Sequence, residues 1–266
     1  MLVNSSDLKG LTIRATDGDL GTVEQFYFDD QNWTIRYLVV DTGGWLSGRR
    51  VLISPYSVWR PSWHEKRLDV SLTKSQVEQS PNIDTHKPVN RQHESTYLDY
   101  YGYPSYWGGP YLWGPAPYPM APPPIPTTIT GAVPERSGGQ SQDSHLRMSD
   151  EVAGYHIEAT DGEIGHVTRF VIDDQAWAIR YLEVSTKNWW PGKNVLVSPA
   201  WVKKVSWPES KVYVAVSRDS IQTSPDYEAS MPIDREYETR LYSHYGEPPY
   251  WLLEAKQKPA LMTSGV

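Results

Sequence analysis

The sequence predicts an all-β-dominated fold of two small β-barrels, each followed by a short helical extension and joined by a Pro/Gly-rich linker. Two observations lead to this prediction. The chain repeats itself without gaps at an offset of 144 residues. Each copy carries about five or six short strand patterns and no long helical pattern. Short strands of this kind suit a closed or nearly closed barrel, because closure hides the edges of the sheet.

The repeat can be followed residue by residue. The motif ATDG occurs at 15–18 and again at 159–162. The register continues to the Tyr-Trp pairs at 106–107 and 250–251. Identity over the repeat is about 40%, which is far above chance for a fixed offset. We therefore expect two domains of the same architecture.

The strand patterns are short and separated by turn residues. In the first copy, strands are expected at 12–15, 23–28, 33–40, 51–53 and 68–72. The acidic turn at 29–32 makes a hairpin of the second and third strands. After the last strand of each copy, Thr73 and Ser217 are expected to cap the start of a short helix.

Each barrel is followed by a helical pattern. Tyr, Leu and Glu recur at helical spacing in 91–101 and in 235–245, and a glycine follows each segment as a stop signal. An aromatic hook comes next in both copies, at 104–107 and 248–251. These patterns set the domain boundaries: barrel 1–82, extension 83–107, linker 108–145, barrel 146–226, extension 227–254 and tail 255–266.

The linker is rich in Pro, Gly and Tyr and poor in charge. This composition favours an extended segment over a packed layer. We therefore expect that shortening it within 110–142 leaves both barrels folded.

The glycine turns, the Ile-Arg-Tyr-Leu strand and the Leu-Ile-Ser-Pro strand occur in one order, from residue 7 to about residue 72. In that order they resemble the PRC-barrel family. The second copy resembles it from residue 151 to about residue 216. Members of this family include the H-type cytoplasmic barrel of the photosynthetic reaction centre and half of a bacterial ribosome maturation factor. The helix and hook are similar to an extension of stand-alone bacterial members.

The resemblance implies a small β-barrel that serves in docking and assembly rather than in catalysis. Our leading hypothesis is a non-enzymatic adaptor for protein interaction or assembly. Two alternatives follow from the resemblance: a membrane-associated accessory of a photosynthetic or electron-transport complex, and a ribosome-maturation-like factor. An enzyme is the third alternative, and it would require a deep pocket with converging titratable groups.

Composition narrows the classes of partner. The net charge is −7 and no Lys/Arg cluster is present, so nucleic acid is not an expected partner. The absence of cysteine excludes disulfides and thiolate metal sites. No apolar run approaches eighteen residues and no signal peptide is visible. We expect a cytoplasmic protein without a transmembrane segment, and peripheral membrane association stays open.

No residue is assigned a catalytic, cofactor-binding or metal-binding role. The paired aspartates at 29–30 and 173–174 are interpreted as solvated hairpin turns, since a calcium site needs further ligands at loop spacing. None of the seven histidines has a histidine mate at the repeat offset. Arg36 and Arg180 are expected to form structural ion pairs.

Aromatic side chains are the candidate interaction residues, because Trp and Tyr lead interface hot spots. The candidates are Trp45, Trp107, Trp189, Trp190, Tyr250 and Trp251. For Trp45 and Trp189 the alternative is a lid over the open end of the barrel. The expected partner is an unidentified protein, or the two barrels packing on each other about a pseudo-twofold axis.

Overall fold

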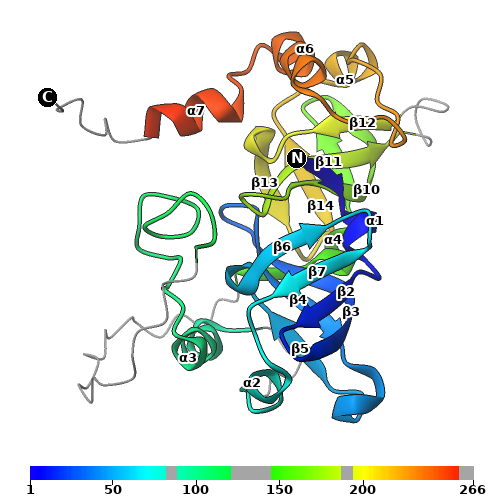
Figure 1. The fold of residues 1–266 in the computed structure, drawn as a ribbon. Coiled ribbons are helices and arrows are strands. Elements are labelled where there is room, and N and C mark those ends of the chain that lie inside the picture. Colours follow the sequence, from blue (N-terminus) through cyan, green and yellow to red (C-terminus); the bar gives the residue numbers. More distant parts are fainter. Residues whose placement is uncertain (82–88, 121–144, 187–193, 258–266) are drawn as a thin grey trace, which may run out of the picture. The chain divides into compact units, whose positions relative to one another are not determined.

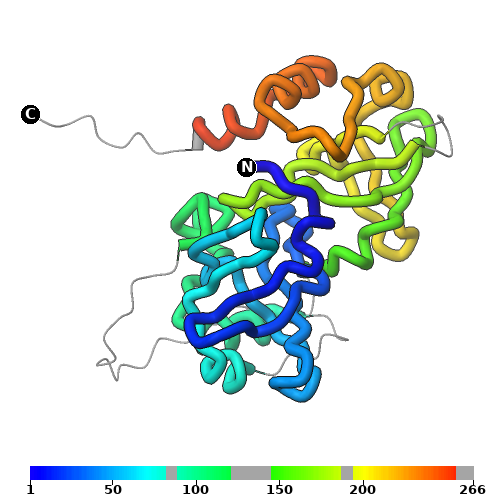
Figure 2. The backbone as a smooth tube through the Cα atoms, turned by 45° about the vertical axis from the view of Figure 1, so that its right-hand side comes forward, coloured from blue at the N-terminus to red at the C-terminus, as the bar shows by residue number. Residues whose placement is uncertain are grey.

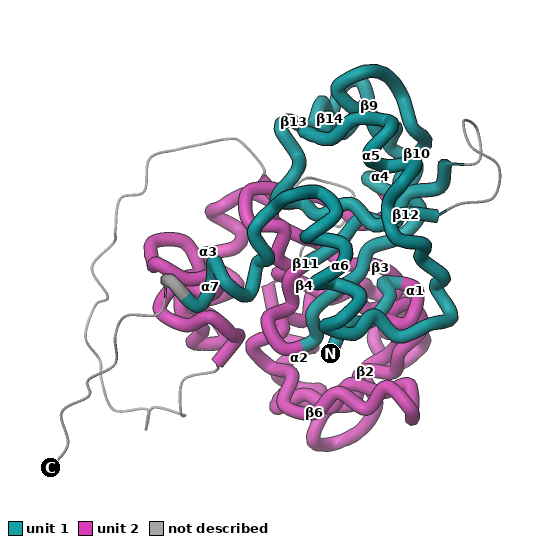
Figure 3. Tube along the Cα trace, turned by 90° about the horizontal axis from the view of Figure 1, so that it is seen from above, with its two compact units in different colours: residues 1–5, 152–174, 179–266 teal, residues 6–151, 175–178 magenta. Residues whose placement is uncertain are grey.

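The computed structural model describes residues 1–81, 89–120, 145–186 and 194–257. The chain forms two compact units, coloured separately in Figure 3. Unit 2 contains Ser6–Glu151 and Gln175–Ala178, and unit 1 contains Met1–Ser5, Val152–Asp174 and Ile179–Val266. The predicted first barrel begins at residue 1, but the first five residues belong to the unit of the second repeat.

Unit 2 is built on a curved sheet of short strands around one long strand (Figure 1). Its strands are β2 (Thr12–Ala15), β3 (Gly18–Asp29), β4 (Thr34–Asp41), β5 (Arg50–Ile53), β6 (Val58–Ser62), β7 (Arg67–Val70) and β8 (Leu146–Met148). They are ordered β5-β4-β3-β2-β7-β6, and β8 pairs with the end of β3. The β2–β7 pair is parallel and the others are antiparallel.

Unit 1 repeats this topology. Its strands are β1 (Leu2–Asn4), β9 (His156–Ala159), β10 (Gly162–Asp173), β11 (Ala178–Ser185), β12 (Asn194–Val197), β13 (Val202–Ser206) and β14 (Lys211–Val214). The order is β12-β11-β10-β9-β14-β13, with β1 on β10 and a parallel β9–β14 pair. The predicted all-β fold with barrel-like domains is confirmed.

The helices are short. They are α1 (Ser5–Leu8), α2 (Lys74–Glu78), α3 (Arg91–Tyr101), α4 (Ser149–Val152), α5 (Arg218–Gln222), α6 (Arg235–Tyr245) and α7 (Tyr250–Gln257), with 3-10 turns η1 (Gly43–Leu46), η2 (Pro55–Ser57) and η3 (Pro199–Trp201). Within the described residues, no helix is both long and apolar enough to cross a membrane.

The two helices predicted after the barrels, 91–101 and 235–245, match α3 and α6 at both ends. The side chain of Asn90 accepts the backbone N–H of His93 at the start of α3. Gly102 takes the left-handed conformation that ends it, with φ of 70°. Asp234 and Gly246 do the same for α6, so local signals alone decide these ends.

Strand β4 is buried along almost its whole length, because both of its faces are covered. One face lies in the barrel core. On the other, α3 packs through Tyr97, whose ring lies edge-on to that of Tyr37 on β4, with the centroids 5.0 Å apart. The hydroxyl of Tyr97 also donates to Leu52 O at 3.0 Å and accepts the N–H of Ser54 at 3.1 Å. The helical extension is therefore part of the domain core, and it places polar side chains over β4.

The long strands bend at a glycine. A Cβ at Gly21 would lie 1.9 Å from Asp41 O, and one at Gly165 would lie 1.9 Å from Ser185 O. Both residues also have a φ near +150°, at 150° and 146°. Only glycine permits this approach of two strands, which explains its recurrence in both copies.

Candidate functional site

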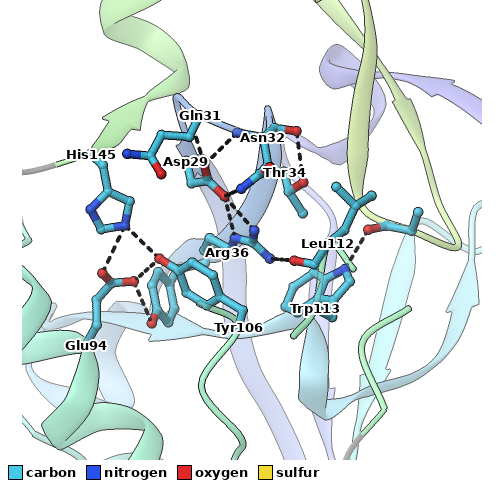
Figure 4. Close-up of polar contacts among 12 residues, drawn as sticks. Asp29, Gln31, Asn32, Thr34, Arg36, Glu94, Tyr106, Leu112, Trp113 and His145 are labelled. Atoms are coloured by element: carbon cyan, nitrogen blue, oxygen red, sulfur yellow. Dashed lines mark hydrogen bonds and ion pairs between the residues drawn. The ribbon is translucent and has the colours of Figure 1, made fainter. Parts of the chain in front are cut away.

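A buried arginine on β4 is the centre of the polar cluster in unit 2 (Figure 4). The guanidinium of Arg36 contacts Asp29 Oδ2 through Nε at 3.0 Å and through Nη2 at 2.5 Å. Its Nη1 donates to Leu112 O at 2.7 Å. Both charged side chains are 1% exposed. The predicted ion pair of Arg36 is confirmed, and it is shielded from solvent.

Aromatic rings cover the guanidinium. The Cζ atom of Arg36 lies 3.7 Å from the ring centroid of Tyr106 and 4.8 Å from that of Trp113. A desolvated cation over an aromatic face gains about 2 kcal/mol or more. Arg36, a strand residue about seventy residues earlier in the sequence, thus holds the hook and the segment after it.

Asp29 is not part of a solvated turn, which corrects the expectation for 29–30. Its Oδ1 accepts the backbone N–H groups of Gln31 at 3.0 Å and Asn32 at 2.8 Å, and Oδ2 faces Arg36. These hydrogen bonds satisfy the acceptor oxygens of a carboxylate that the β3–β4 hairpin buries beneath the helical extension of unit 2. The turn aspartate therefore serves the core of unit 2.

A second carboxylate in the close-up is linked to the arginine through Tyr106. Glu94 on α3 is fully buried and accepts the hydroxyl of Tyr106 at 2.5 Å and that of Tyr37 at 3.3 Å. His145 Nε2 lies 3.2 Å from Glu94 Oε2 and 2.8 Å from Tyr106 Oη. Since Tyr106 donates to Glu94, its oxygen accepts from His145, so Nε2 carries the proton.

Burial raises the pKa of the Tyr37 and Tyr106 hydroxyls well above the usual range, and the charge of Glu94 adds to this. Both tyrosines therefore act as hydrogen-bond donors at neutral pH. The charge of Glu94 is further balanced by Arg91, whose Nη1 lies 3.5 Å away. The hydrogen bonds and the ion pair of this cluster therefore hold the buried carboxylate of Glu94 in a fixed position.

Unit 1 carries the mate of this cluster. Arg180 contacts Asp173 at 2.8 Å and lies 3.9 Å below the ring of Tyr250. Glu238 accepts the hydroxyl of Tyr181 at 2.8 Å. The third partner differs, because Glu254 on α7 contacts Arg180 at 2.6 Å in place of a backbone carbonyl. The ion pair predicted for Arg180 is confirmed.

The beginning of the linker differs from the sequence-based interpretation of 108–145. Trp113 is 1% exposed, its Nε1 donates to Ala176 O at 2.8 Å, and its carbonyl accepts the hydroxyl of Tyr56 at 3.4 Å. His145 at the other end of this segment is also buried. Residues 121–144 lie outside the described part of the chain.

The candidate interaction residues lie at several places. Trp45 is half-buried, with its Nε1 donating to Leu20 O at 2.5 Å. Trp107 and Trp251 are half-buried, and each lies under an arginine at 4.1 Å and 3.9 Å, respectively. Tyr250 lies against Arg180. Trp189 and Trp190 fall outside the described residues. Their role in binding a partner stays a prediction.

Sequence reasoning missed Trp113, His145 and Glu254. Trp113 had a usable signal, since the run Tyr-Leu-Trp at 111–113 is too apolar for an extended linker. No local pattern marks His145 or Glu254, whose partners are far away in the sequence. Among the described residues, no group of three or more His, Asp or Glu side chains is placed to hold a metal ion.

Large apolar side chains are exposed on α7 of unit 1. Leu252 is 52% exposed and Leu253 is 40% exposed, while Tyr250 of the same helix contacts Arg180. At the repeat offset the mates of these leucines are Gly108 and Gly109. The apolar pair is therefore a feature of the second copy alone.

Residues 2–76 match the PRC-barrel domain. No curated protein matches the chain. The matched segment runs from β1 through β2–β7 into α2, in the order and with the glycine turns described above. The chain therefore contains a PRC-barrel domain at residues 2–76.

Proposed function

We propose that the protein is a non-enzymatic adaptor for protein interaction or assembly, built from two PRC-barrel domains. The observation that carries the proposal is the exposed apolar pair Leu252 and Leu253 on α7. The same helix is held to the barrel by Tyr250 and Glu254, which both contact Arg180. An anchored helix with an exposed apolar pair suits docking into a groove of a partner.

The assignment of the second repeat as a PRC-barrel rests on topology. Every strand pairing of unit 2 has its mate in unit 1, including the parallel pair and the bend at glycine. The two buried arginines and their aspartates also correspond. Shared register, pairing and buried charges support one architecture for both copies.

The buried clusters support a structural role rather than chemistry. The guanidinium of Arg36 has a carboxylate, a backbone carbonyl and two aromatic rings as neighbours. Its mate Arg180 has two carboxylates and an aromatic ring. Groups engaged in this way hold the extensions on the barrels. They support a rigid scaffold that presents a binding surface.

We place this adaptor in the cytoplasm. The alternative of a membrane-associated accessory predicts a different distribution in a cell lysate. Fractionation into soluble and membrane pools separates the two, because an adaptor of soluble partners stays in the soluble pool. Recovery chiefly in the membrane pool would favour the accessory.

The docking surface is tested by a double variant, Leu252→Gln with Leu253→Gln. Glutamine keeps the helix propensity and removes the apolar surface. Partners captured by the intact chain are identified, and their recovery by the variant is expected to fall at least about tenfold, the effect of 1.4 kcal/mol. The control is Trp59→Gln, since Trp59 is 64% exposed on unit 2.

Two outcomes contradict the proposal. The first is equal recovery of every partner by the double variant and by the intact chain. The second is an equal loss with Trp59→Gln, which would point to a general effect of exposed apolar area. Circular dichroism of both variants must match the parent, because the substituted side chains are exposed.

A further inference from the structure

The first five residues of each repeat complete the other repeat. Met1–Ser5 belongs to unit 1, whose remaining residues come from the second half of the chain. Residues 145–149 are their mates at the repeat offset and belong to unit 2. Figure 2 shows the N-terminal segment running beside the strand β10. The two copies have exchanged equivalent strands.

The contacts in unit 1 are specific. In β1, Leu2 and Asn4 pair with Asp173 and Val171 of β10. The carbonyl of Met1 accepts the N–H of Asp174 at 3.0 Å.

At the other end of the segment, Ser5 Oγ accepts the N–H of Phe170 at 3.1 Å. The side chain of Val3 is 8% exposed. The segment thus adds a strand, buries an apolar side chain and bonds a backbone donor at each of its ends.

The contacts in unit 2 are the same ones. Leu146 and Met148 of β8 pair with Asp29 and Tyr27 of β3. The carbonyl of His145 accepts the N–H of Asp30 at 2.9 Å.

Ser149 Oγ accepts the N–H of Phe26 at 3.3 Å. In addition, Arg147 forms an ion pair with Asp30 at 2.9 Å. Two segments of different sequence therefore occupy equivalent positions through the same backbone bonds and one shared serine.

The edge that receives the strand is an incomplete surface without it. It would expose backbone N–H and C=O groups beside buried apolar residues such as Phe170 and Ile172. Such an edge pairs readily with an extended peptide. Two features of a strand would select it for this edge. One is an apolar residue within the strand, and the other is a hydroxyl at its end that accepts a buried N–H.

We propose that this edge, Phe170–Asp174 on unit 1 and Phe26–Asp30 on unit 2, is a strand-acceptor site whose ligand is the N-terminal strand of another repeat. The strand comes from the opposite half of the chain, and it binds equally when supplied as a separate molecule. This inference does not depend on the adaptor role, since it concerns how repeats of this kind recognise each other.

Cysteine cross-linking tests the exchange in the full chain, which has no natural cysteine. A cleavage sequence for a specific protease is placed within 121–144. Asn4→Cys with Val171→Cys then joins neighbours on β1 and β10 that lie in different fragments after cleavage. Directly opposed antiparallel residues have the Cα separation that a disulfide needs.

The expected result is one non-reduced species of full mass after cleavage, which reduction splits in two. The matched control is Asn4→Cys with Tyr27→Cys, which would be linked only if each repeat kept its own strand. Linkage in the control and two free fragments from the first variant would overturn the proposal.

Supply of the strand as a separate molecule is tested with the full chain lacking residues 1–5. Peptides of residues 1–8 and 145–152 are added, and a scrambled peptide serves as control. Each repeat peptide is expected to raise the melting temperature of the truncated chain by roughly 4 °C or more and to leave the intact chain unchanged.

If the truncated chain does not fold, recovery of folded protein on refolding with each peptide replaces the melting temperature. Equal effects of the scrambled and the repeat peptides would overturn the proposal. So would the absence of any effect of either repeat peptide on the truncated chain.

Discussion

Replacing Trp113 with alanine tests whether the segment after the first hook is a structural part of unit 2. The substitution removes a side chain that is 1% exposed, stacks near Arg36 and donates to Ala176 O. If the segment were only a linker, the same change would have almost no effect on folding. The structure predicts a large effect.

The magnitude follows from three losses. Truncation of a buried Trp to Ala costs about 3–5 kcal/mol through lost transfer free energy and the cavity that is left. The cation–π contact is worth about 1–2 kcal/mol, and the hydrogen bond about 1 kcal/mol. These contributions overlap, so the expected decrease in the free energy of unfolding is about 4 kcal/mol.

Urea unfolding followed by circular dichroism measures the change. With a slope near 2 kcal/mol per molar urea, the transition of unit 2 is expected to move to lower urea by about 2 M. Tyr118→Ala is the matched control, because Tyr118 follows in the same segment and is 43% exposed. A Trp113→Ala midpoint within about 0.3 M of the control would refute the packing argument.

Three further predictions concern the buried charges, the bend and the tyrosines. Asp29→Asn leaves Arg36 without a carboxylate and is expected to lower the free energy of unfolding, measured in urea, by about 3–5 kcal/mol. Asp173→Asn is expected to cost at least about 1 kcal/mol less, because Arg180 keeps its contact with Glu254. Equal costs of the two substitutions would contradict this. Gly21→Ala is expected to lower the melting temperature by more than roughly 10 °C, since a Cβ at this position would meet Asp41 O. In the control Gly44→Ala the added Cβ meets no neighbour, so its melting temperature is expected to stay near that of the parent. Burial raises the pKa of Tyr97, so the folded state keeps a proton that the unfolded chain loses above a pH of about 10. Since other buried tyrosines share this shift, the parent loses stability above that pH, and Tyr97→Phe is expected to lose up to about 1.4 kcal/mol less per pH unit. Urea midpoints of Tyr97→Phe that fall as steeply as those of the parent would refute this.

Local features of the fold were predictable from the sequence. The ends of α3 and α6 were located to the residue, because Asn90 and Gly102, and their mates, impose their conformations on the adjacent backbone. The hairpin of β3 and β4 and the caps at Thr73 and Ser217 follow for the same reason. These signals act over a few residues and need no knowledge of distant partners.

The candidate site was predictable only in part. The pairing of Arg36 with a carboxylate could be expected from a charged residue in an apolar strand. The positions of Trp113, Glu94 and His145 could not, because each meets Arg36 or its neighbours across a long sequence separation. An aspartate in a solvated turn and an aspartate buried in the core look alike in a sequence. Only the residues that pack over the turn decide between the two.

The sequence by itself determined the duplication, the strand and helix patterns and the glycine turns, since these depend on local backbone geometry and on an offset of 144 residues. The tertiary structure alone decided which repeat each N-terminal strand completes. Residues 1–5 and 145–149 occupy equivalent positions in the repeat, so either could in principle pair with either acceptor edge. The choice depends on which edge each strand can reach through the chain that connects them, and local sequence patterns do not determine that connection.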